Sequence, residues 1–223
     1  VLERGMSMMK SSVKKIGALV AAAVMVCAIF VGCGSSKYDT STPDGALMTQ
    51  LDALKTGDFS QLEGYSKEAI EETGFTEAQL KDLMTSLFGK STYTAQNVET
   101  VSDTEAKVTV SGKAVDMSKF IPIVSTEFLA KATEFATKND TTNMTAEEAQ
   151  KQVMALFIDA AKAKKSSIEL KDVTVTVTME KKDGKWDVSS DDDNMNSLTE
   201  LLAGSTTEEL VESMQGLFGG SFA

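Results

Sequence analysis

The sequence of 223 residues contains no histidine. Histidine is the commonest general base near neutral pH and a frequent ligand of transition metals. Its absence excludes a Ser-His-Asp triad and every metal site that needs an imidazole. Any catalysis would have to rely on carboxylates, lysines or hydroxyl groups.

Cysteine is nearly absent as well. The two cysteines, Cys27 and Cys33, both lie close to the N-terminal end of the sequence. Disulfide frameworks, zinc–thiolate sites and thiol nucleophiles are therefore excluded from the long segment after Cys33. A chain of this size can bury roughly 70% of its unfolded surface, so a core can form without disulfides.

Positive charge is scarce. The chain has 22 lysines and arginines against 33 aspartates and glutamates, a net charge of −11. Residues 1–32 carry a net +3, which leaves −14 for residues 33–223. This excess repels nucleic acids and anionic polymers, so we expect no nucleic-acid partner. The charge serves solubility or, alternatively, attracts a cationic ligand or a basic partner.

The N-terminal segment has the organisation of a secretory signal. Three lysines, Lys10, Lys14 and Lys15, precede an uncharged run of 16 residues over 16–31. A basic start, an apolar middle and a small residue before a cleavage point are typical of such signals. The alternative is a transmembrane anchor, but a bilayer core needs about 20 apolar residues. The length of the run therefore favours a cleaved signal.

The end of this segment resembles the lipobox of bacterial lipoproteins. The residues that carry the resemblance are Phe30-Val31-Gly32-Cys33, followed by Gly34-Ser35-Ser36. The resemblance implies cleavage between Gly32 and Cys33 and attachment of lipid, with palmitate-type acyl chains, to Cys33. We therefore expect a signal peptide over 1–32, a tether over 33–42 and lipid anchoring at the outer face of the cell membrane.

The rest of the chain alternates between helical and strand-like hydrophobic patterns. Apolar residues recur with helical spacing in some segments and with a period of two in others. Helices are predicted over 43–56, 66–73, 76–88, 125–137 and 145–164, with further helices after 194, and paired strands over 91–117 and 168–190. This order predicts an α+β fold in which two hairpins form one antiparallel sheet, covered by the helices 43–56 and 76–88.

Short local signals support these boundaries. Pro43 suits a first helical position, and Gly57 suits a helix end. Capping boxes are predicted at Thr76/Gln79, Thr145/Glu148 and Ser205/Glu208. Asp183-Gly184 predicts a tight type I′ hairpin turn, and Gly112 predicts a β-bulge.

Three segments resemble secreted Gram-positive lipoprotein domains with a nuclear-transport-factor-like, or cystatin-like, fold. They are LDALKTGDF over 51–59, DTEAKVTV over 103–110 and KDGKWDV over 182–188. The resemblance implies a curved sheet with helices in its concave face, often with a pocket, and most such domains have no assigned activity. We assign 43–194 to this domain, with a helical insertion over 123–164, and 195–223 to a C-terminal helical extension.

Few residues are candidates for chemistry. Tyr65, Tyr93 and Trp186 could line a pocket, although aromatic residues lie more often in cores. Asp116 could act as a base if a shifted register turned it inward. If Val115 and Met117 face the helices on a regular strand, Asp116 faces solvent.

The acidic run Asp191-Asp192-Asp193 invites comparison with calcium loops. Such a loop needs glycine at position 6 and glutamate at position 12, but counting from Asp191 gives Asn196 and Leu202. We expect these carboxylates to stabilise a helix N-terminus instead. No metal and no cofactor is predicted.

These observations favour a lipid-anchored extracytoplasmic domain that binds a protein, a peptide or a small molecule and is not an enzyme. One alternative is a small hydrolase or isomerase that uses a pocket carboxylate. Another is the solute receptor of an importer, although such receptors usually have two lobes.

Overall fold

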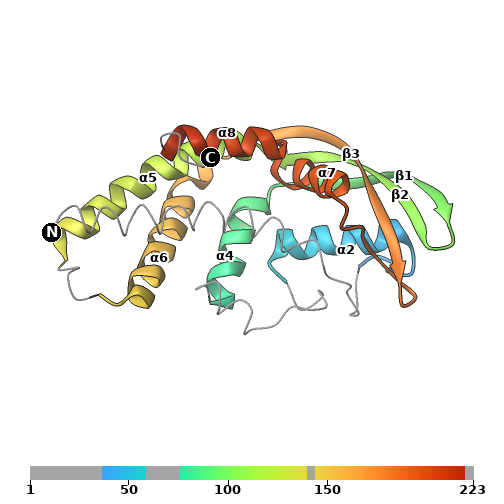
Figure 1. Ribbon diagram of the computed structural model, residues 1–223, viewed down its shortest axis with the longest axis horizontal. Coiled ribbons are helices and arrows are strands. Elements are labelled where there is room, and N and C mark those ends of the chain that lie inside the picture. The colour runs from blue at the N-terminus through green and yellow to red at the C-terminus, as the bar shows by residue number, and fades with distance from the viewer. Residues whose placement is uncertain (1–36, 59–75, 140–143, 219–223) are drawn as a thin grey trace.

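The computed structural model describes residues 37–58, 76–139 and 144–218. The strands form one end of the molecule, and a pair of helices, α5 and α6, extends toward the other end (Figure 1). In chain order the elements are α2 (Pro43–Thr56), α4 (Glu77–Phe88), β1 (Thr92–Ser102), β2 (Glu105–Val115), α5 (Met117–Lys138), α6 (Ala146–Lys164), the 3-10 turn η2 (Lys165–Ser167), β3 (Leu170–Lys182), β4 (Lys185–Val188), α7 (Asp192–Ala203) and α8 (Thr207–Phe218).

The four strands form one antiparallel sheet in the order β1-β2-β3-β4. The α5–α6 pair separates β2 from β3 in the sequence, yet these two strands are neighbours along their whole length. The backbone N–H of Asp116, just after β2, donates to the carbonyl of Glu169, just before β3 (2.9 Å). The prediction that both hairpins share one sheet is therefore confirmed, and so is the α+β class. The cystatin-like details remain a prediction.

Alternation of side chains gives the sheet one buried face and one polar face. On β3, Val173, Val175 and Val177 are buried, whereas Thr174 and Thr176 are exposed. The matching positions of β2, at Ala106, Val108 and Val110, are almost completely buried. A half-buried antiparallel strand requires this period of two, so the sequence pattern and the observed faces agree.

The bulge predicted at Gly112 is not observed. The register shifts occur on β1, between Ala95 and Asn97 and between Thr100 and Ser102, whereas Gly112 pairs regularly with Tyr93 and Val173. A Cβ atom at Gly112 would lie 1.8 Å from the carbonyl oxygen of Thr92. The glycine is therefore required by close approach of β1, rather than by an extra residue in β2.

The turn between β3 and β4 has the predicted geometry. Asp183 has φ 52° and Gly184 has φ 81°. Positive φ at both central positions is the requirement of a type I′ turn.

Three helices lie against the sheet: α2 against β1, β2 and β4, α4 against β2, and α7 against β2 and β3. Helix α2 contributes Leu47, Leu51 and Leu54 to the core, and its first residue is Pro43, as predicted. Helix α4 contributes the apolar stripe Leu83, Met84, Leu87 and Phe88. The capping boxes at Thr76/Gln79 and Thr145/Glu148 are both present, and Gly57 ends α2 in the left-handed conformation. The helix predicted over 66–73 lies outside the described residues.

Helix α5 starts earlier than predicted. Its first residue is Met117 rather than a residue near 125, and it continues through Pro122. Proline inside a helix removes one backbone donor and is costly, which is why the sequence favoured a later start. Burial of Phe120 and Val124 on the same helix face as Phe128 accompanies the longer helix. The tertiary packing thus outweighs the local preference.

Helix α7 belongs to the main core. Leu198, Leu201 and Leu202 are at most 4% exposed, and α7 lies against β2 and β3. Residues 195–203 of the predicted C-terminal extension are therefore part of the α+β domain. Helix α8 follows and lies along α5 (Figure 1).

The residues just before α2 are ordered, although they fall within the predicted tether. Tyr38 packs against the core, and the Ser41 backbone donates to the Asp39 carboxylate (2.9 Å). The Thr42 hydroxyl caps α2 by accepting from Gly45 N–H (3.2 Å). Residues 38–42 of the predicted tether therefore belong with α2 and the core.

Candidate functional site

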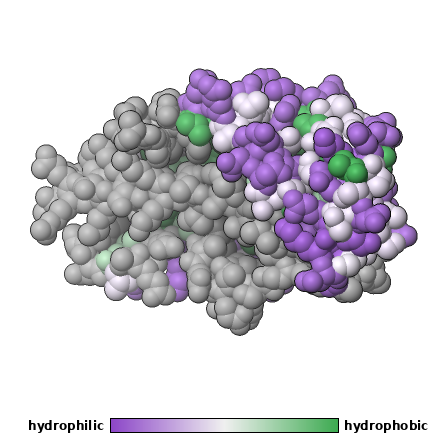
Figure 2. Space-filling model, turned by 45° about the vertical axis from the view of Figure 1, so that its right-hand side comes forward, coloured by the Kyte–Doolittle hydropathy of each residue, from purple (hydrophilic) through white to green (hydrophobic). Residues whose placement is uncertain are grey.

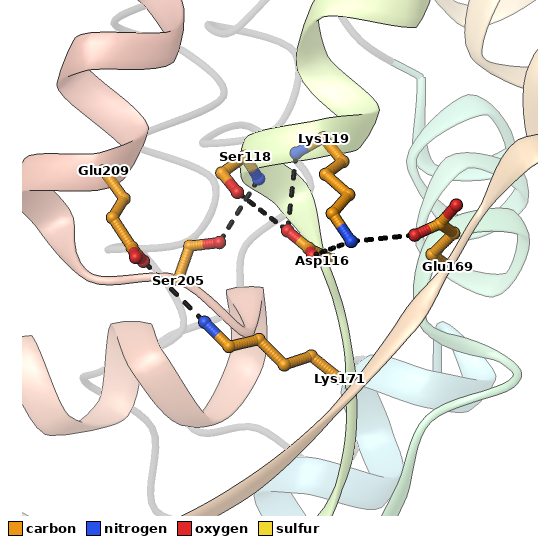
Figure 3. A network of polar contacts seen from close by, with 7 residues as sticks. All are labelled: Asp116, Ser118, Lys119, Glu169, Lys171, Ser205 and Glu209. Carbon is orange, nitrogen blue, oxygen red and sulfur yellow. Dashed lines mark hydrogen bonds and ion pairs between the residues drawn. The ribbon is translucent and has the colours of Figure 1, made fainter.

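A group of polar contacts surrounds Asp116, where β2 ends and α5 begins (Figure 3). The Asp116 carboxylate accepts a hydrogen bond from the Ser118 hydroxyl (2.7 Å) and one from the Lys119 backbone (3.4 Å). The Lys119 ammonium lies 3.2 Å from Asp116 Oδ2 and 2.9 Å from Glu169 Oε2. We call these four residues the Asp116 cluster.

Electrostatics stabilise the charged forms of this cluster. Burial alone would raise the pKa of Asp116, but the hydrogen bonds from Ser118 and Lys119 and the charge of Lys119 together lower that pKa below its usual value. The pKa of Lys119 is raised, first by Glu169 and then by Asp116. A general base near neutral pH would need a raised carboxylate pKa, so this arrangement favours a structural cap.

The sequence-based alternatives for Asp116 assumed a regular strand through Met117. In the structure the strand ends at Val115, and Asp116 is the N-cap of α5. Val115, Asp116 and Met117 are therefore all buried, which strict alternation forbids. Neither the solvent-facing alternative nor the register-shift alternative describes Asp116, because the chain changes from strand to helix at this residue.

The connection between α7 and α8 docks onto the same place. The Ser205 hydroxyl is fully buried and accepts a hydrogen bond from the Ser118 backbone (3.2 Å). The predicted Ser205/Glu208 capping box is shifted by one residue, since Thr206 and Glu209 make the two reciprocal bonds (3.2 and 2.8 Å). Ser205 joins α5 to α7 instead, a role that local spacing does not reveal.

The described residues of the predicted pocket lie far apart. Tyr93 is on β1 and Trp186 on β4, the two outer strands of the sheet. Tyr93 lies level with Val173 and Trp186 with Lys181, which separates them by roughly 25 Å along the strands. These two residues therefore do not line one pocket. Tyr65 lies outside the described residues.

Each of these aromatic residues has its own environment. Burial raises the pKa of Tyr93 to about 12, and the neighbouring Ser91 hydroxyl offsets only part of that rise. Trp186 is buried, with the Lys181 ammonium 5.5 Å from the ring centre. Both rings therefore contribute to packing at the edges of the sheet.

A buried carboxylate that the sequence did not single out lies on β4. Asp187 is 7% exposed and accepts hydrogen bonds from the Gln50 amide (3.2 Å) and from the Val188 backbone (2.8 Å). This contact joins α2 to the closing strand. The alternation of β4 would have placed a polar residue outward, so no sequence signal marks Asp187.

The acidic run before α7 forms the predicted helix cap. Asp191 is the N-cap and accepts from Asn194 N–H (2.9 Å) and from the Ser189 hydroxyl (2.8 Å). These bonds, led by the one from Asn194, lower the pKa of Asp191. Within the described part of the chain, no group of three or more carboxylates is arranged to hold a metal ion.

Substitution of Asp116 by alanine is expected to lower the free energy of unfolding by about 2–3 kcal/mol, since it removes a helix cap and a buried charged acceptor. The Asp116→Asn variant keeps a capping oxygen and should lose less. Urea denaturation at neutral pH measures both effects.

The lowered pKa of Asp116 also predicts a pH dependence. The contribution of this carboxylate to the free energy of unfolding is fully present above its unfolded pKa of about 3.9. It is lost as the pH falls through the lower pKa of the folded state. The difference in the free energy of unfolding between the wild-type protein and Asp116→Asn should therefore shrink as the pH falls. A difference in the free energy of unfolding that stays constant between about pH 7 and about pH 2 would contradict the lowered pKa of Asp116.

The predicted lipid-attachment residue Cys33 and the cleavage position after Gly32 lie outside the described residues. Over 37–58, 76–139 and 144–218, none of the helices combines the length and the hydrophobicity needed to cross a bilayer.

Comparison with known proteins gives a family and one structural relative. No curated protein matches the chain. A crystal structure of a candidate lipoprotein (YcdA) from Bacillus subtilis matches with 22% sequence identity and a TM-score of 0.44. The match covers 72% of this chain and 55% of that one, so the present chain spans little more than half the length of that protein.

The family comparison covers most of the described fold. Residues 40–203 match a domain of unknown function, DUF5105. The matched segment begins just before α2 and ends with the last residue of α7. It therefore includes the whole sheet, the α5–α6 pair and the helix that completes the core. The chain belongs to the DUF5105 family of domains of unknown function.

Proposed function

We propose that this protein is a lipid-anchored binding protein on the outer face of the membrane of a Gram-positive bacterium. The observation that carries the proposal is the Gly32-Cys33 pair directly after the apolar run 16–31. In the proposal, Cys33 becomes the first residue of the exported protein and holds it to the membrane. Two or more acyl chains anchor a protein stably, whereas one chain binds only marginally.

The ordered start of the domain limits its distance from the anchor. Tyr38 already packs against the core, which leaves residues 33–37 as the connection. Even fully extended, these residues reach only about 18 Å. The proposed anchor thus keeps the domain next to the membrane surface, where it can meet partners that lie at that surface.

Binding rather than catalysis is supported by the chemistry available. The chain has no histidine, and its only cysteines are Cys27 and Cys33. The Asp116 carboxylate serves as a helix cap in an ion pair, and Asp187 is hydrogen-bonded to Gln50. The resemblance to nuclear-transport-factor-like lipoprotein domains is part of this proposal, because in that fold the helices in the concave face of the sheet often leave a pocket.

The experiment that tests the anchor compares two cysteine variants in cells supplied with a labelled fatty acid. The Cys33→Ala variant should lose all incorporation of the label and should not be processed at Gly32. The Cys27→Ala variant is the matched control, because it removes the other cysteine of the same segment. It should be labelled and processed like the wild type. Equal labelling of the wild type and Cys33→Ala would overturn the proposal.

A further inference from the structure

Helix α8 is held to the rest of the protein less firmly than α7, although both helices have 12 residues. Helix α7 buries Leu198, Leu201 and Leu202 and lies against the sheet. None of the described side chains of α8, over 207–213, is buried, and Leu210 is only partly buried where it packs against the core. Tertiary packing supplies most of the stability of a helix in a protein, so α8 has the weaker support of the two.

The polar contacts described between α8 and the rest of the chain lie at the surface. The Thr207 hydroxyl donates to the side-chain oxygen of Asn196 on α7 (2.7 Å), at an exposed position. The Glu209 carboxylate lies 4.0 Å from the Lys171 ammonium, and both side chains are about half exposed (Figure 3). Exposed ion pairs contribute little to stability. These contacts therefore do not hold α8 in place by themselves.

The residues directly before α8 are, in contrast, firmly docked. Gly204 has φ 58°, and a Cβ atom at this position would lie 2.7 Å from the carbonyl oxygen of Val115. The Ser205 hydroxyl is fully buried and accepts a hydrogen bond from the Ser118 backbone (3.2 Å). A firmly placed segment therefore ends at Ser205, and the weakly held helix begins at Thr207.

Helix α8 begins with a cap of its own. The Thr206 hydroxyl accepts a hydrogen bond from Glu209 N–H (3.2 Å), and the Glu209 carboxylate accepts one from Thr206 N–H (2.8 Å). The Leu210 amide donates to the Thr206 carbonyl (3.1 Å), which closes the first turn. These bonds are local to 206–210, so the start of α8 is capped without help from the rest of the protein. The helix can therefore form or be lost as one unit.

The contact between α5 and α8 leaves apolar side chains of both helices exposed. Leu129 on α5 is 42% exposed, and Val211 on α8 is 39% exposed. On the face that Figure 2 shows, hydrophobic residues form only small, separate spots on a mostly hydrophilic described surface. A permanent docking site is usually marked by a large continuous apolar patch. The exposed apolar residues of α5 and α8 therefore indicate incomplete packing between the two helices.

We propose that α8 is a strap that detaches from α5 as one unit, turning at Thr206, while the fold up to Ser205 stays intact. Release uncovers the side of α5 along which α8 lies (Figure 1). An isolated helix of 12 residues is marginal in water, so α8 loses its helical structure when it is released. This conformational device goes beyond the proposed function and does not depend on the lipid anchor.

Hydrogen exchange at single amides, measured on the full chain in detergent, tests the proposal. Relative to unfolded rates, the amides of Leu210 and Val211 should exchange about 100-fold or more faster than those of Leu201 and Leu202. Exchange on α8 should hardly depend on urea, since local release exposes little surface, whereas exchange on α7 should follow global unfolding. Fraying of α8 from Phe218 alone would differ, because the first turn at Leu210 would then keep the protection of α7.

Two alanine variants on α8 sharpen the test. The Leu210→Ala variant removes the partly buried contact with the core and should speed exchange over α8 about fivefold or more. The Val211→Ala variant is the matched control, because Val211 is exposed, and it should not speed exchange. Because the wild-type measurement stands alone, an unfolded variant would not remove the test.

A glutamate-specific protease gives a second readout on the full chain. Helix α8 offers Glu208, Glu209 and Glu212 to such a protease, and α7 offers Glu200 as the control. Under native conditions, cleavage should occur on α8 while Glu200 stays intact. The shortened product should keep slow exchange at Leu201, since the fold up to Ser205 does not depend on α8.

Three outcomes would overturn the inference. The first is protection of the α8 amides as strong as that of the α7 amides. The second is protection that falls gradually from Leu210 toward Phe218, which would mean fraying rather than release of a unit. The third is cleavage on α8 that requires global unfolding, so that Glu200 is cut together with it. None of these results bears on lipid labelling at Cys33, so failure of the inference and failure of the anchor are distinguishable.

Discussion

The Leu201→Ala variant is expected to lose about 2–5 kcal/mol of the free energy of unfolding, the usual range for removing a buried leucine side chain. Leu201 has no exposed surface and lies on α7, which packs against β2 and β3. The truncation leaves a cavity between this helix and the sheet. The result would show that α7 is part of the cooperative core and not an appended segment.

The matched control lies on the next helix. Val211 on α8 is 39% exposed, so the Val211→Ala variant should change the free energy of unfolding by no more than about 0.5 kcal/mol. Chemical denaturation, followed by far-ultraviolet circular dichroism, measures both variants. Equal, small effects of the two substitutions would mean that α7 does not contribute to the main core.

The Gly112→Ala variant is expected to lose about 3 kcal/mol or more of the free energy of unfolding, because it forces an atom into space that is already occupied. The added Cβ would lie 1.8 Å from the Thr92 carbonyl oxygen, in the backbone of β1. A backbone atom cannot move aside as the end of a flexible side chain can. Strands β1 and β2 would have to separate locally, and the pairing of Tyr93 with Gly112 would be lost.

Gly184 provides the comparison, since it is constrained by its backbone conformation alone. Its φ is 81°, but an added Cβ would meet no atom within 4 Å. The Gly184→Val variant should cost roughly 1–3 kcal/mol from backbone strain, confined to the β3–β4 turn. Thermal and chemical denaturation of both glycine variants checks the order of the effects. A smaller loss for Gly112→Ala than for Gly184→Val would contradict the close approach of β1.

Features that depend on neighbouring residues in the chain could be predicted from the sequence. The capping boxes at Thr76 and Thr145, the end of α2 at Gly57 and the turn at Asp183-Gly184 all form as predicted. The alternation of valine and threonine on β3 likewise predicted its buried and exposed faces. Each of these signals is complete within a few residues, so distant packing does not alter it.

The extent of the sheet could also be predicted, for a different reason. Two strand pairs with one apolar face each must bury those faces, and a single sheet under shared helices does so with the least exposed edge. The chain segment between them did not obscure this, because α5 and α6 form their own contacts. One of these is the edge-to-face pair of Phe128 and Phe157, whose ring centres are 6.4 Å apart.

The structural roles of several residues depend on tertiary contacts and could not be predicted from the sequence. The sequence pattern placed Asp116 in a strand, whereas in the structure it is the N-cap of α5. Pro122 lies inside α5 because burial of the helix face outweighs the lost hydrogen bond. Ser205 supports α5 rather than capping α8, since the Ser118 backbone lies within reach only in the folded chain.

The sequence by itself determined the class of fold, the main helix boundaries and the chemistry that is excluded by the lack of histidine. It also supplied the Gly32-Cys33 signal on which the proposed anchor depends. Only the tertiary structure separated Tyr93 from Trp186, buried Asp187 against Gln50 and left part of β3 without a neighbouring strand. These features depend on strand order and strand length, which result from contacts between segments far apart in the chain.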